Sequence, residues 1–402
     1  MKTIACCLLT YNHPDIVEQV LSLSAQSYAE HGIDIYLYDS SEDDATRLAV
    51  ARFESFLPNV HYVDVKHISS GDAKFYEIIQ GHYLPKHYDY IWPCKDRTFL
   101  ADKTLDGVAK AIQNGDYDIV FAVDERDRWE LRWPKVKDEY DDAVEFFSHY
   151  GQLTTNWVAL IRKSETMIDS VNWQQLTDMY NLGDNNFNQT LSLFGILADM
   201  DKPKIRVIHN EKAGMRESDL PSAKSLWYDK VINIWVEKWI PAIFSLPDIY
   251  NEHKMAVIQS ELGLNSLFGG TDSLVFYRDI GAITLENYNA IRDSWSIISP
   301  IPTNIADLIF RGQDDKWQDI MMGDFVEAFK RKSYDEAYFI FNCCNRLKFI
   351  LGEKIHSDLK ICFNVYRDEL HNKGYSALFE GVDSVDALIL KYYSITGNKP
   401  SS

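Results

Sequence analysis

Three features are scarce in this 402-residue sequence, and each scarcity excludes a class of protein. No run of about 18 apolar residues occurs, so no segment is predicted to span a membrane. Basic residues are few, since 41 Lys and Arg stand against 60 Asp and Glu, for a formal net charge of −19. Because nucleic-acid binding needs clustered Lys and Arg to neutralise phosphates, we expect no nucleic-acid partner.

Cysteine is also scarce, with six residues in the whole chain. They are the adjacent pairs Cys6-Cys7 and Cys343-Cys344, together with Cys94 and Cys362. This spacing matches neither a disulfide framework nor a Cys-x-x-Cys zinc site, so we expect reduced, buried thiols in a cytoplasmic protein. A strand-like segment begins directly after Met1-Lys2-Thr3, so we expect no signal peptide. Peripheral attachment to the inner face of a membrane stays open.

The first forty residues carry the clearest pattern that is present. Ile4–Thr10 is short and apolar, and the turn-prone Asn12-His13-Pro14 ends it, which predicts a buried strand followed by a helix. A second apolar run ends at Asp39, and two serines and three acids follow it. Open α/β sheets bind ligands at the carboxyl ends of their parallel strands. The sequence therefore predicts a ligand site where these two strands end.

Two segments in this region are similar to a known family. Leu9-Thr10-Tyr11-Asn12 and Tyr38-Asp39-Ser40-Ser41-Glu42-Asp43 resemble the opening of family-2, inverting nucleotide-sugar glycosyltransferases of the GT-A fold. The resemblance implies that Thr10, Tyr11, Asn12 and Asp39 hold the uracil and ribose of the donor. Asp39 matches the second Asp of the family's usual Asp-Asp-Gly-Ser pattern, and Tyr38 replaces the first. The alternative for Asp39 is an acid that only closes the turn after the strand.

The segment Tyr88–Arg97 ends in a degenerate form of the family's Asp-x-Asp metal motif. The helix that follows fixes the register, which places Cys94-Lys95-Asp96 in the motif. The resemblance implies a divalent metal, Mn²⁺ or Mg²⁺, on Asp96 and the donor diphosphate, and such hard cations prefer oxygen to a Cys94 thiol. Two alternatives stay open: Lys95 or Arg97 supplies part of the metal's charge, or the domain has lost catalysis.

Three further basic positions are candidates by their place in the pattern. Lys74 lies early in a predicted helix, Gly71–Ile79, where the family commonly has a basic residue near the donor; it either contacts a phosphate or is simply solvated. A predicted strand ends in His209 before a basic loop. The resemblance implies that His209 is a metal ligand or contacts the diphosphate, with Arg216 as a weaker phosphate contact. A structural histidine is the alternative.

The candidate catalytic base is Asp184, just before the apolar segment Leu191–Leu197 of a predicted helix. The family usually carries an acid at the start of this helix, which removes the proton from the acceptor hydroxyl. Asp178 lies one loop too early to match. Asp184 could instead cap the helix, and the two roles are compatible.

The pattern also predicts two domains. Residues 1–220 should form an α/β domain of the GT-A type, a mixed sheet flanked by helices, and residues 221–402 a mostly helical domain. Stripes that include Trp235, Trp239 and Trp317 predict buried helices, whereas Leu262–Asn304, with four glycines, could hold strands or irregular packing. The second domain could serve acceptor recognition or self-association into a homo-oligomer.

The sequence therefore predicts an inverting glycosyltransferase, of the hexosyl or N-acetylhexosaminyl type. It would move a sugar from a uridine-linked or other nucleoside-diphosphate donor to a glycan, a lipid-linked saccharide or a glycoprotein. A sugar nucleotidyltransferase is a weaker reading, because Thr10-Tyr11-Asn12-His13 is no Gly-rich, basic phosphate loop. A binding or scaffold protein on a decayed transferase fold is the other alternative, and the degenerate motif supports it.

Overall fold

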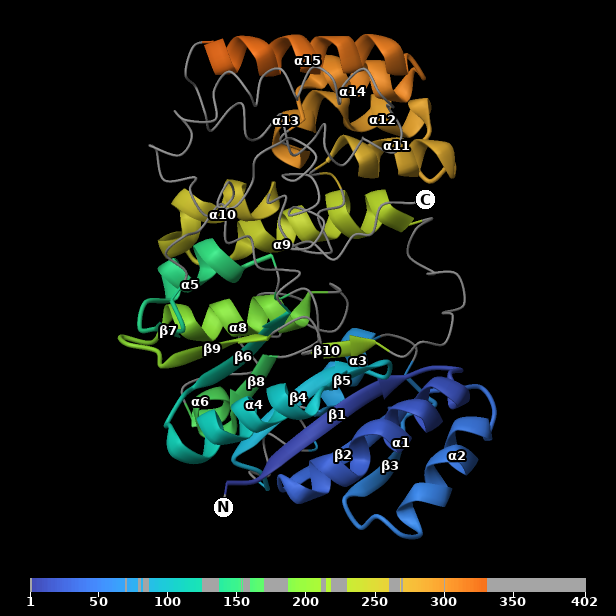
Figure 1. The fold of residues 1–402 in the computed structure, drawn as a ribbon, viewed down its shortest axis with the longest axis vertical. Helices are drawn as coiled ribbons and strands as arrows, with labels where there is room; N and C mark the ends of the chain where they lie inside the picture. Colours follow the sequence, from blue (N-terminus) through green and yellow to red (C-terminus); the bar gives the residue numbers. More distant parts are fainter. Residues whose placement is uncertain are drawn as a thin grey trace, which may run out of the picture. The chain divides into compact units, whose positions relative to one another are not determined.

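The computed structural model forms two compact units along the chain (Figure 1). It describes residues 2–68, 71–78, 81, 87–124, 137–152, 154, 160–169, 187–210, 215–217, 230–259, 268, 270–299 and 301–330. The first unit comprises Met1–Arg128, Val136–Ser225 and Val236–Val257, and the second contains the remaining segments. Within the described ranges, no helix is both long and apolar enough to cross a membrane.

The first unit is built on a mixed eight-stranded sheet in the order β3-β2-β1-β4-β8-β6-β9-β7. Strand β8 is antiparallel to β4 and β6, β7 is antiparallel to β9, and the other neighbours are parallel. The strands are β1 (Ile4–Thr10), β2 (Ile33–Asp39), β3 (Val60–Asp64), β4 (Tyr90–Lys95), β6 (Ile119–Asp124), β7 (Glu139–Tyr140), β8 (Leu160–Lys163) and β9 (Ile205–Asn210). Two short strands, β5 (Thr98–Leu100) and β10 (Met215–Glu217), pair separately.

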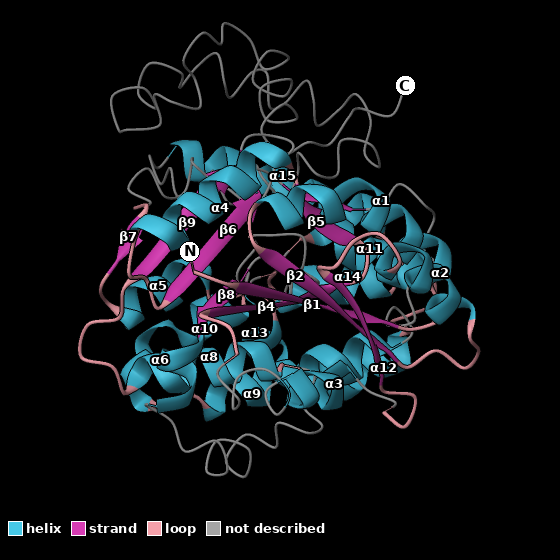
Figure 2. Ribbon diagram, turned by 90° about the horizontal axis from the view of Figure 1, so that it is seen from below, coloured by secondary structure: helices cyan, strands magenta, loops and turns pink. Residues whose placement is uncertain are grey.

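Helices cover both faces of this sheet (Figure 2). Alternate residues of β1, β2 and β4 pack against α1 (Pro14–Glu30), α2 (Ala45–Glu54) and α4 (Asp102–Asn114) in one core. The opposite face is covered by α3 (Gly71–Ile78) and α8 (Asn188–Ala198). The unit also contains α5 (Ala143–Tyr150), α6 (Ser164–Asp169), α9 (Ile240–Ser245) and α10 (Asn251–Ile258). The predicted α/β fold class is confirmed.

Pro14 illustrates how the sequence sets these elements. It occupies the first turn of α1, where its missing N–H is not needed, and the loop from β1 is only three residues long. The apolar stripe of α1 is buried as predicted. The sequence pattern does not predict the helix α2 or the strands β5, β7 and β10; strands of two or three residues are too short to show an alternation of apolar and polar positions.

The described secondary-structure elements of the second unit are all helical. Its helices are α11 (Thr271–Asp279), α12 (Leu285–Ile291), α13 (Trp295–Ile298), α14 (Thr303–Phe310) and α15 (Asp314–Lys330). Trp295 is fully buried at its centre, and its indole N–H donates to Ile301 O at 2.7 Å. The possibility of strands within 262–304 is wrong for the described residues there. The predicted boundary at 220 lies in 218–229, outside the described residues.

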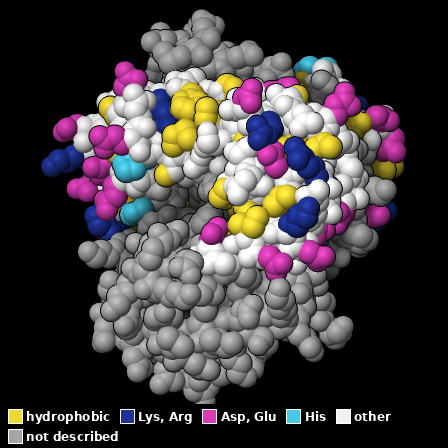
Figure 3. All heavy atoms as spheres, turned by 90° about the horizontal axis from the view of Figure 1, so that it is seen from above, with side chains coloured by type: hydrophobic (Ala, Val, Ile, Leu, Met, Phe, Trp, Pro, Cys, Tyr) yellow, Lys and Arg dark blue, Asp and Glu magenta, His cyan; other side chains and the backbone are white. Residues whose placement is uncertain are grey.

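The surface of the described part mixes charges of both signs. Figure 3 shows one face, on which acidic, basic and hydrophobic side chains are interspersed. Some of these charges form ion pairs. In the second unit, Arg278 pairs with Asp314 and Arg292 with Asp307.

Candidate functional site

Three polar side chains form a row across the carboxyl ends of neighbouring strands. Thr10, the last residue of β1, pairs with Asp39, the last residue of β2. On the opposite edge of β1, Leu9 pairs with Lys95, the last residue of β4. The next residue, Asp96, therefore lies beside Thr10. All three side chains are at least nine-tenths buried. The parallel sheet therefore brings together at its ligand edge three residues that the sequence had singled out.

Asp96 is held by the loop that follows β1. Its Oδ2 accepts a hydrogen bond from Thr10 Oγ1 at 2.9 Å and lies 2.9 Å from His13 Nδ1. Sequence reasoning used His13 only as a turn residue and missed this contact. The position of His13 in the sequence could have indicated the contact, because a three-residue loop between the end of a strand and a helix must lie at the ligand edge of the sheet.

Asp39 is fully buried, and both of its carboxylate oxygens accept hydrogen bonds from the chain. Oδ1 accepts from the backbone N–H of Ser41 at 2.8 Å and from the Ser41 hydroxyl, and Oδ2 accepts from the Tyr62 hydroxyl at 3.0 Å. These contacts give Asp39 the turn-closing role that was its alternative. Its contact with a nucleotide stays a prediction.

The loop after β1 is clamped to the loop after β2. Asn12 has a φ of +54°, a left-handed conformation that asparagine tolerates better than most residues. Its backbone N–H donates to Ser41 Oγ at 2.8 Å, and its side-chain oxygen accepts from the N–H of Glu42 at 3.0 Å. The Tyr11 hydroxyl donates to Glu42 Oε1 at 2.8 Å, while 42% of the residue stays exposed. The fixed, exposed ring of Tyr11 is suited to stack on a flat base.

Lys74 reaches the same row from α3. It is only 5% exposed, and its Nζ donates to the carbonyl oxygen of Thr10 at 2.6 Å. The alternative of a simply solvated side chain is therefore wrong. Burial lowers the pKa of Lys74 to about 8, although the negative charges of Asp39 and Asp96 act in the opposite direction.

This depressed pKa predicts a pH-dependent stability. Below pH 8 both the folded and the unfolded chain bind the Lys74 proton, and the cost of burying the charge is present in full. Between about pH 8 and 10.5 the folded state loses the proton that the unfolded state keeps, so stability rises with pH, by up to about 3 kcal/mol. Denaturant unfolding across this range should show a rise in wild type that Lys74→Met lacks and that Lys110→Met, an exposed control, retains.

The residues next to Asp96 in the degenerate motif differ in their burial. Cys94 is fully buried, its Sγ lies 3.7 Å from Cys6 Sγ, and burial raises the pKa of its thiol well above the usual value. Cys6, Cys7 and Cys94 are free thiols, as expected. Lys95 is exposed and Arg97 half-buried, so the two cations flank Asp96 at the sheet edge.

The described residues fit a divalent metal poorly. Among them, no three His, Cys, Asp or Glu side chains come together as a metal site. The first motif position is occupied by a neutral thiol that faces the core, and Asp96 Oδ2 already contacts Thr10 and His13. The backbone of His209 pairs with Val123 in the sheet, but its side chain lies outside the described residues.

The other predicted residues are placed only in part. Asp184 lies outside the described residues, four positions before α8 begins at Asn188. Arg216 belongs to β10, where its backbone pairs with Phe99, three residues beyond Asp96; its side chain is not described.

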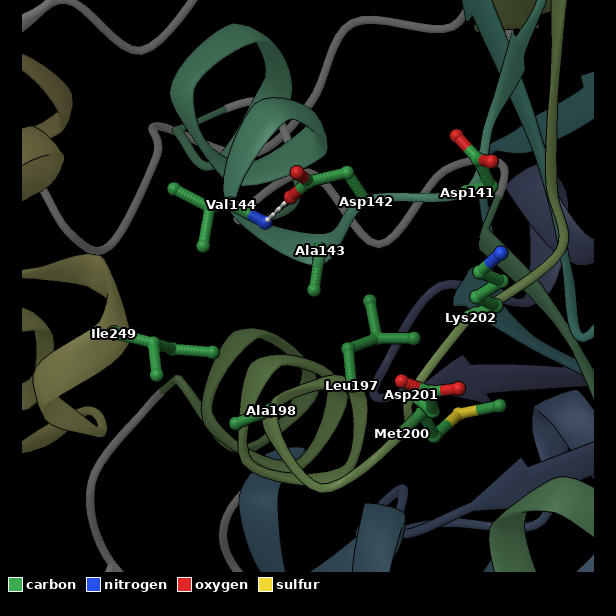
Figure 4. Close-up of a pocket in the computed structure, with 10 residues that line it drawn as sticks. All are labelled: Asp141, Asp142, Ala143, Val144, Leu197, Ala198, Met200, Asp201, Lys202 and Ile249. Atoms are coloured by element: carbon green, nitrogen blue, oxygen red, sulfur yellow. Dashed lines mark hydrogen bonds between the residues drawn. The ribbon is translucent and has the colours of Figure 1, made fainter.

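A cavity of about 360 Å³ lies elsewhere in the first unit (Figure 4). Ala143 and Leu197 point toward one another there between α5 and α8, and the N-cap Asp142 accepts from Val144 N at 2.7 Å. Its wall includes Met200–Lys202, which leads into the first residue of β9. Since β9 runs parallel to β6, this cavity is at the amino edge of the strands, opposite the row of Thr10, Asp39 and Asp96.

Comparison with known proteins finds no matching family model and no matching curated protein. Among solved structures, the chain is similar to S. aureus TarS 1-349, at 12% identity and a TM-score of 0.44 over 79% of this chain and 91% of that one. It is also similar to the mannosyltransferase PcManGT from Pyrobaculum calidifontis in complex with GDP-Man and Mn²⁺, at 12% identity and a TM-score of 0.43, over 85% and 86%.

A third likeness is to glucosyl-3-phosphoglycerate synthase from Mycobacterium tuberculosis, solved with Mn²⁺, UDP and glucosyl-3-phosphoglycerate. Identity is 11% and the TM-score 0.39, over 61% of this chain and 81% of that one.

Proposed function

We propose that this chain is an inverting glycosyltransferase that uses a nucleoside-diphosphate sugar, in the first instance a UDP-sugar, with a hexosyl or N-acetylhexosaminyl group. The observation that carries the proposal is the row of Thr10, Asp39 and Asp96 at the carboxyl ends of β1, β2 and β4, with the exposed ring of Tyr11 beside it. Buried, hydrogen-bonded polar groups at this edge, next to an aromatic face, suit a nucleotide better than a purely structural role.

Each residue has a role in this proposal. Tyr11 and Asn12 would contact the base, and the loop tied down by Asp39 and Asp96 would hold the ribose and diphosphate. Asp184 would accept the proton of the acceptor hydroxyl, whose oxygen forms the new bond to the anomeric carbon while the bond to the diphosphate breaks. A cation must offset the charge on the leaving diphosphate, either a divalent metal on Asp96 and His209 or the side chains of this chain.

The acceptor would be a glycan, a lipid-linked saccharide or a glycoprotein, and the helical C-terminal domain of 221–402 would recognise it or form a homo-oligomer. These assignments, and cytoplasmic localisation, remain predictions. A scaffold role stays the second candidate, because Cys94 occupies the first motif position in the core. A nucleotidyltransferase is disfavoured, since the loop Tyr11–His13 contains none of the glycines, lysines or arginines of a phosphate-binding loop.

Donor hydrolysis by the purified full-length chain tests the proposal. A panel of UDP-, GDP-, ADP- and TDP-sugars is incubated with Mn²⁺, with Mg²⁺ and with EDTA, and release of the nucleotide is followed. Release from one donor, with binding of the same nucleotide by calorimetry, is the expected result. Binding without release, even with candidate acceptors added, favours the scaffold, and the absence of both contradicts the proposed function.

A further inference from the structure

We propose that the buried ammonium of Lys74 is the fixed cation of this site, and that it acts with Lys95 and Arg97 in place of a divalent metal. The inference rests on the proposed function: a nucleoside diphosphate would bind at this edge without Mn²⁺ or Mg²⁺. Three features of the site support it, namely the missing metal ligand, the surviving carboxylate and the local balance of charge.

The missing ligand cannot be replaced by the residue that stands in its position. A metal shared with a diphosphate takes one or two carboxylates from the protein. The first position here holds Cys94, whose side chain is fully buried and lies against Cys6 on the neighbouring strand. Mg²⁺ and Mn²⁺ prefer oxygen, and a neutral thiol in the core offers them no ligand.

The surviving carboxylate serves the protein itself. Asp96 is 6% exposed, and its Oδ2 accepts from Thr10 Oγ1 and contacts His13 Nδ1. The Asp96 carboxylate therefore links the end of β4 to the loop between β1 and α1. A metal on Oδ2 would compete with both contacts, which hold the loop that carries Tyr11 and Asn12.

The local balance of charge favours a diphosphate over a metal ion. The row contains two carboxylates, Asp39 and Asp96, whereas Lys74, Lys95 and Arg97 contribute three cations beside them. A dication brought to this site would meet the fixed Lys74 ammonium, whose charge is poorly screened because the side chain is buried. A diphosphate would be attracted by the same charge, already oriented by its bond to Thr10 O.

Acidic residues of the following loop do not reverse this balance. Glu42 accepts from the Tyr11 hydroxyl, and Asp44 pairs with Arg47 and Lys66. All of these side chains are directed to partners of their own at the surface, so Lys74 stays the buried cation beside the two carboxylates of the row, and the exposed Lys95 and half-buried Arg97 add the remaining positive charge.

Lys74→Met is the informative variant because it should fold. Methionine is close to lysine in length and apolar, and replacing a buried charge by an apolar side chain of similar volume is often tolerated. The carbonyl oxygen of Thr10 keeps a second donor, the N–H of Ser40 at 3.3 Å. Lys110→Met makes the same chemical change on the exposed face of α4 and serves as the matched control.

The test is calorimetric titration of UDP and GDP into the full-length chain, in EDTA and in Mn²⁺. We expect wild type and Lys110→Met to bind one of the two nucleotides equally well, within about twofold, in both buffers. Lys74→Met should bind it at least about tenfold more weakly in EDTA. Mn²⁺ should restore little of this loss, because Cys94 offers it no ligand and Asp96 Oδ2 already contacts Thr10 and His13.

The possible failures are distinguishable. Nucleotide binding by wild type only in Mn²⁺ would overturn the inference and leave the proposed function standing, as would unchanged binding by a folded Lys74→Met chain. If neither nucleotide binds under any condition, the proposed function fails and the inference with it. Should Lys74→Met not fold, as judged by circular dichroism, the comparison of EDTA with Mn²⁺ in wild type decides alone.

Discussion

Replacing Asp184 by asparagine should lower the rate of sugar transfer by about 10² to 10⁴, the usual contribution of a general base, while nucleotide affinity stays unchanged. The N-cap of α8 is Phe187, so the alternative that Asp184 caps this helix is wrong. Asparagine keeps the size and polarity of aspartate, and Asp184→Asn therefore removes only the proton acceptor. Steady-state transfer rates measured beside UDP calorimetry separate the loss of the base from a loss of donor binding.

Asp178→Asn is the matched control, since Asp178 is the nearby acid that does not fit the family's register. It should transfer sugar at the wild-type rate. Full activity in Asp184→Asn, or an equal loss in Asp178→Asn, would remove the assignment of the base. A fall in thermal stability of Asp184→Asn without a fall in rate would identify Asp184 as a structural residue alone.

Replacing Asp39 by leucine should lower the free energy of unfolding by about 3 kcal/mol or more. The side chain is fully buried and accepts from the Ser41 N–H, the Ser41 hydroxyl and the Tyr62 hydroxyl. Leucine fills the space without accepting a hydrogen bond, and the backbone N–H of Ser41 would be left without its acceptor in the core. Chemical denaturation measures the loss.

Asp15→Leu removes a carboxylate from an exposed position in the first turn of α1 and should change stability by well under half of that amount. Asp39→Asn addresses the second role of the same residue. Its amide oxygen can still accept from Ser41, so most of the stability should remain. If Asp39 also contacts the nucleotide, this variant should bind UDP about tenfold more weakly; unchanged affinity would leave Asp39 as a turn-closing acid only.

The local elements of the first unit followed from the sequence because their signals are local. The alternation of apolar strands with helical stripes predicted β1, α1, β2, α3, α4, α8 and β9, and Pro14 and Asp39 marked a helix start and a strand end. Once the strands are parallel, their carboxyl ends meet at one edge. The position of Thr10, Asp39 and Asp96 at that edge therefore follows from the order of strands and helices along the chain.

The tertiary structure alone decided what each of these side chains contacts. Lys74 is buried against Thr10, His13 faces Asp96, and Cys94 faces Cys6, across separations of 64, 83 and 88 residues. A motif gives the types of residue at an edge, but such contacts depend on strand register and on how α3 packs against the sheet. The sequence by itself determined the sheet edge and its residues, and only the packing of distant segments decided that a lysine occupies the interior of the site.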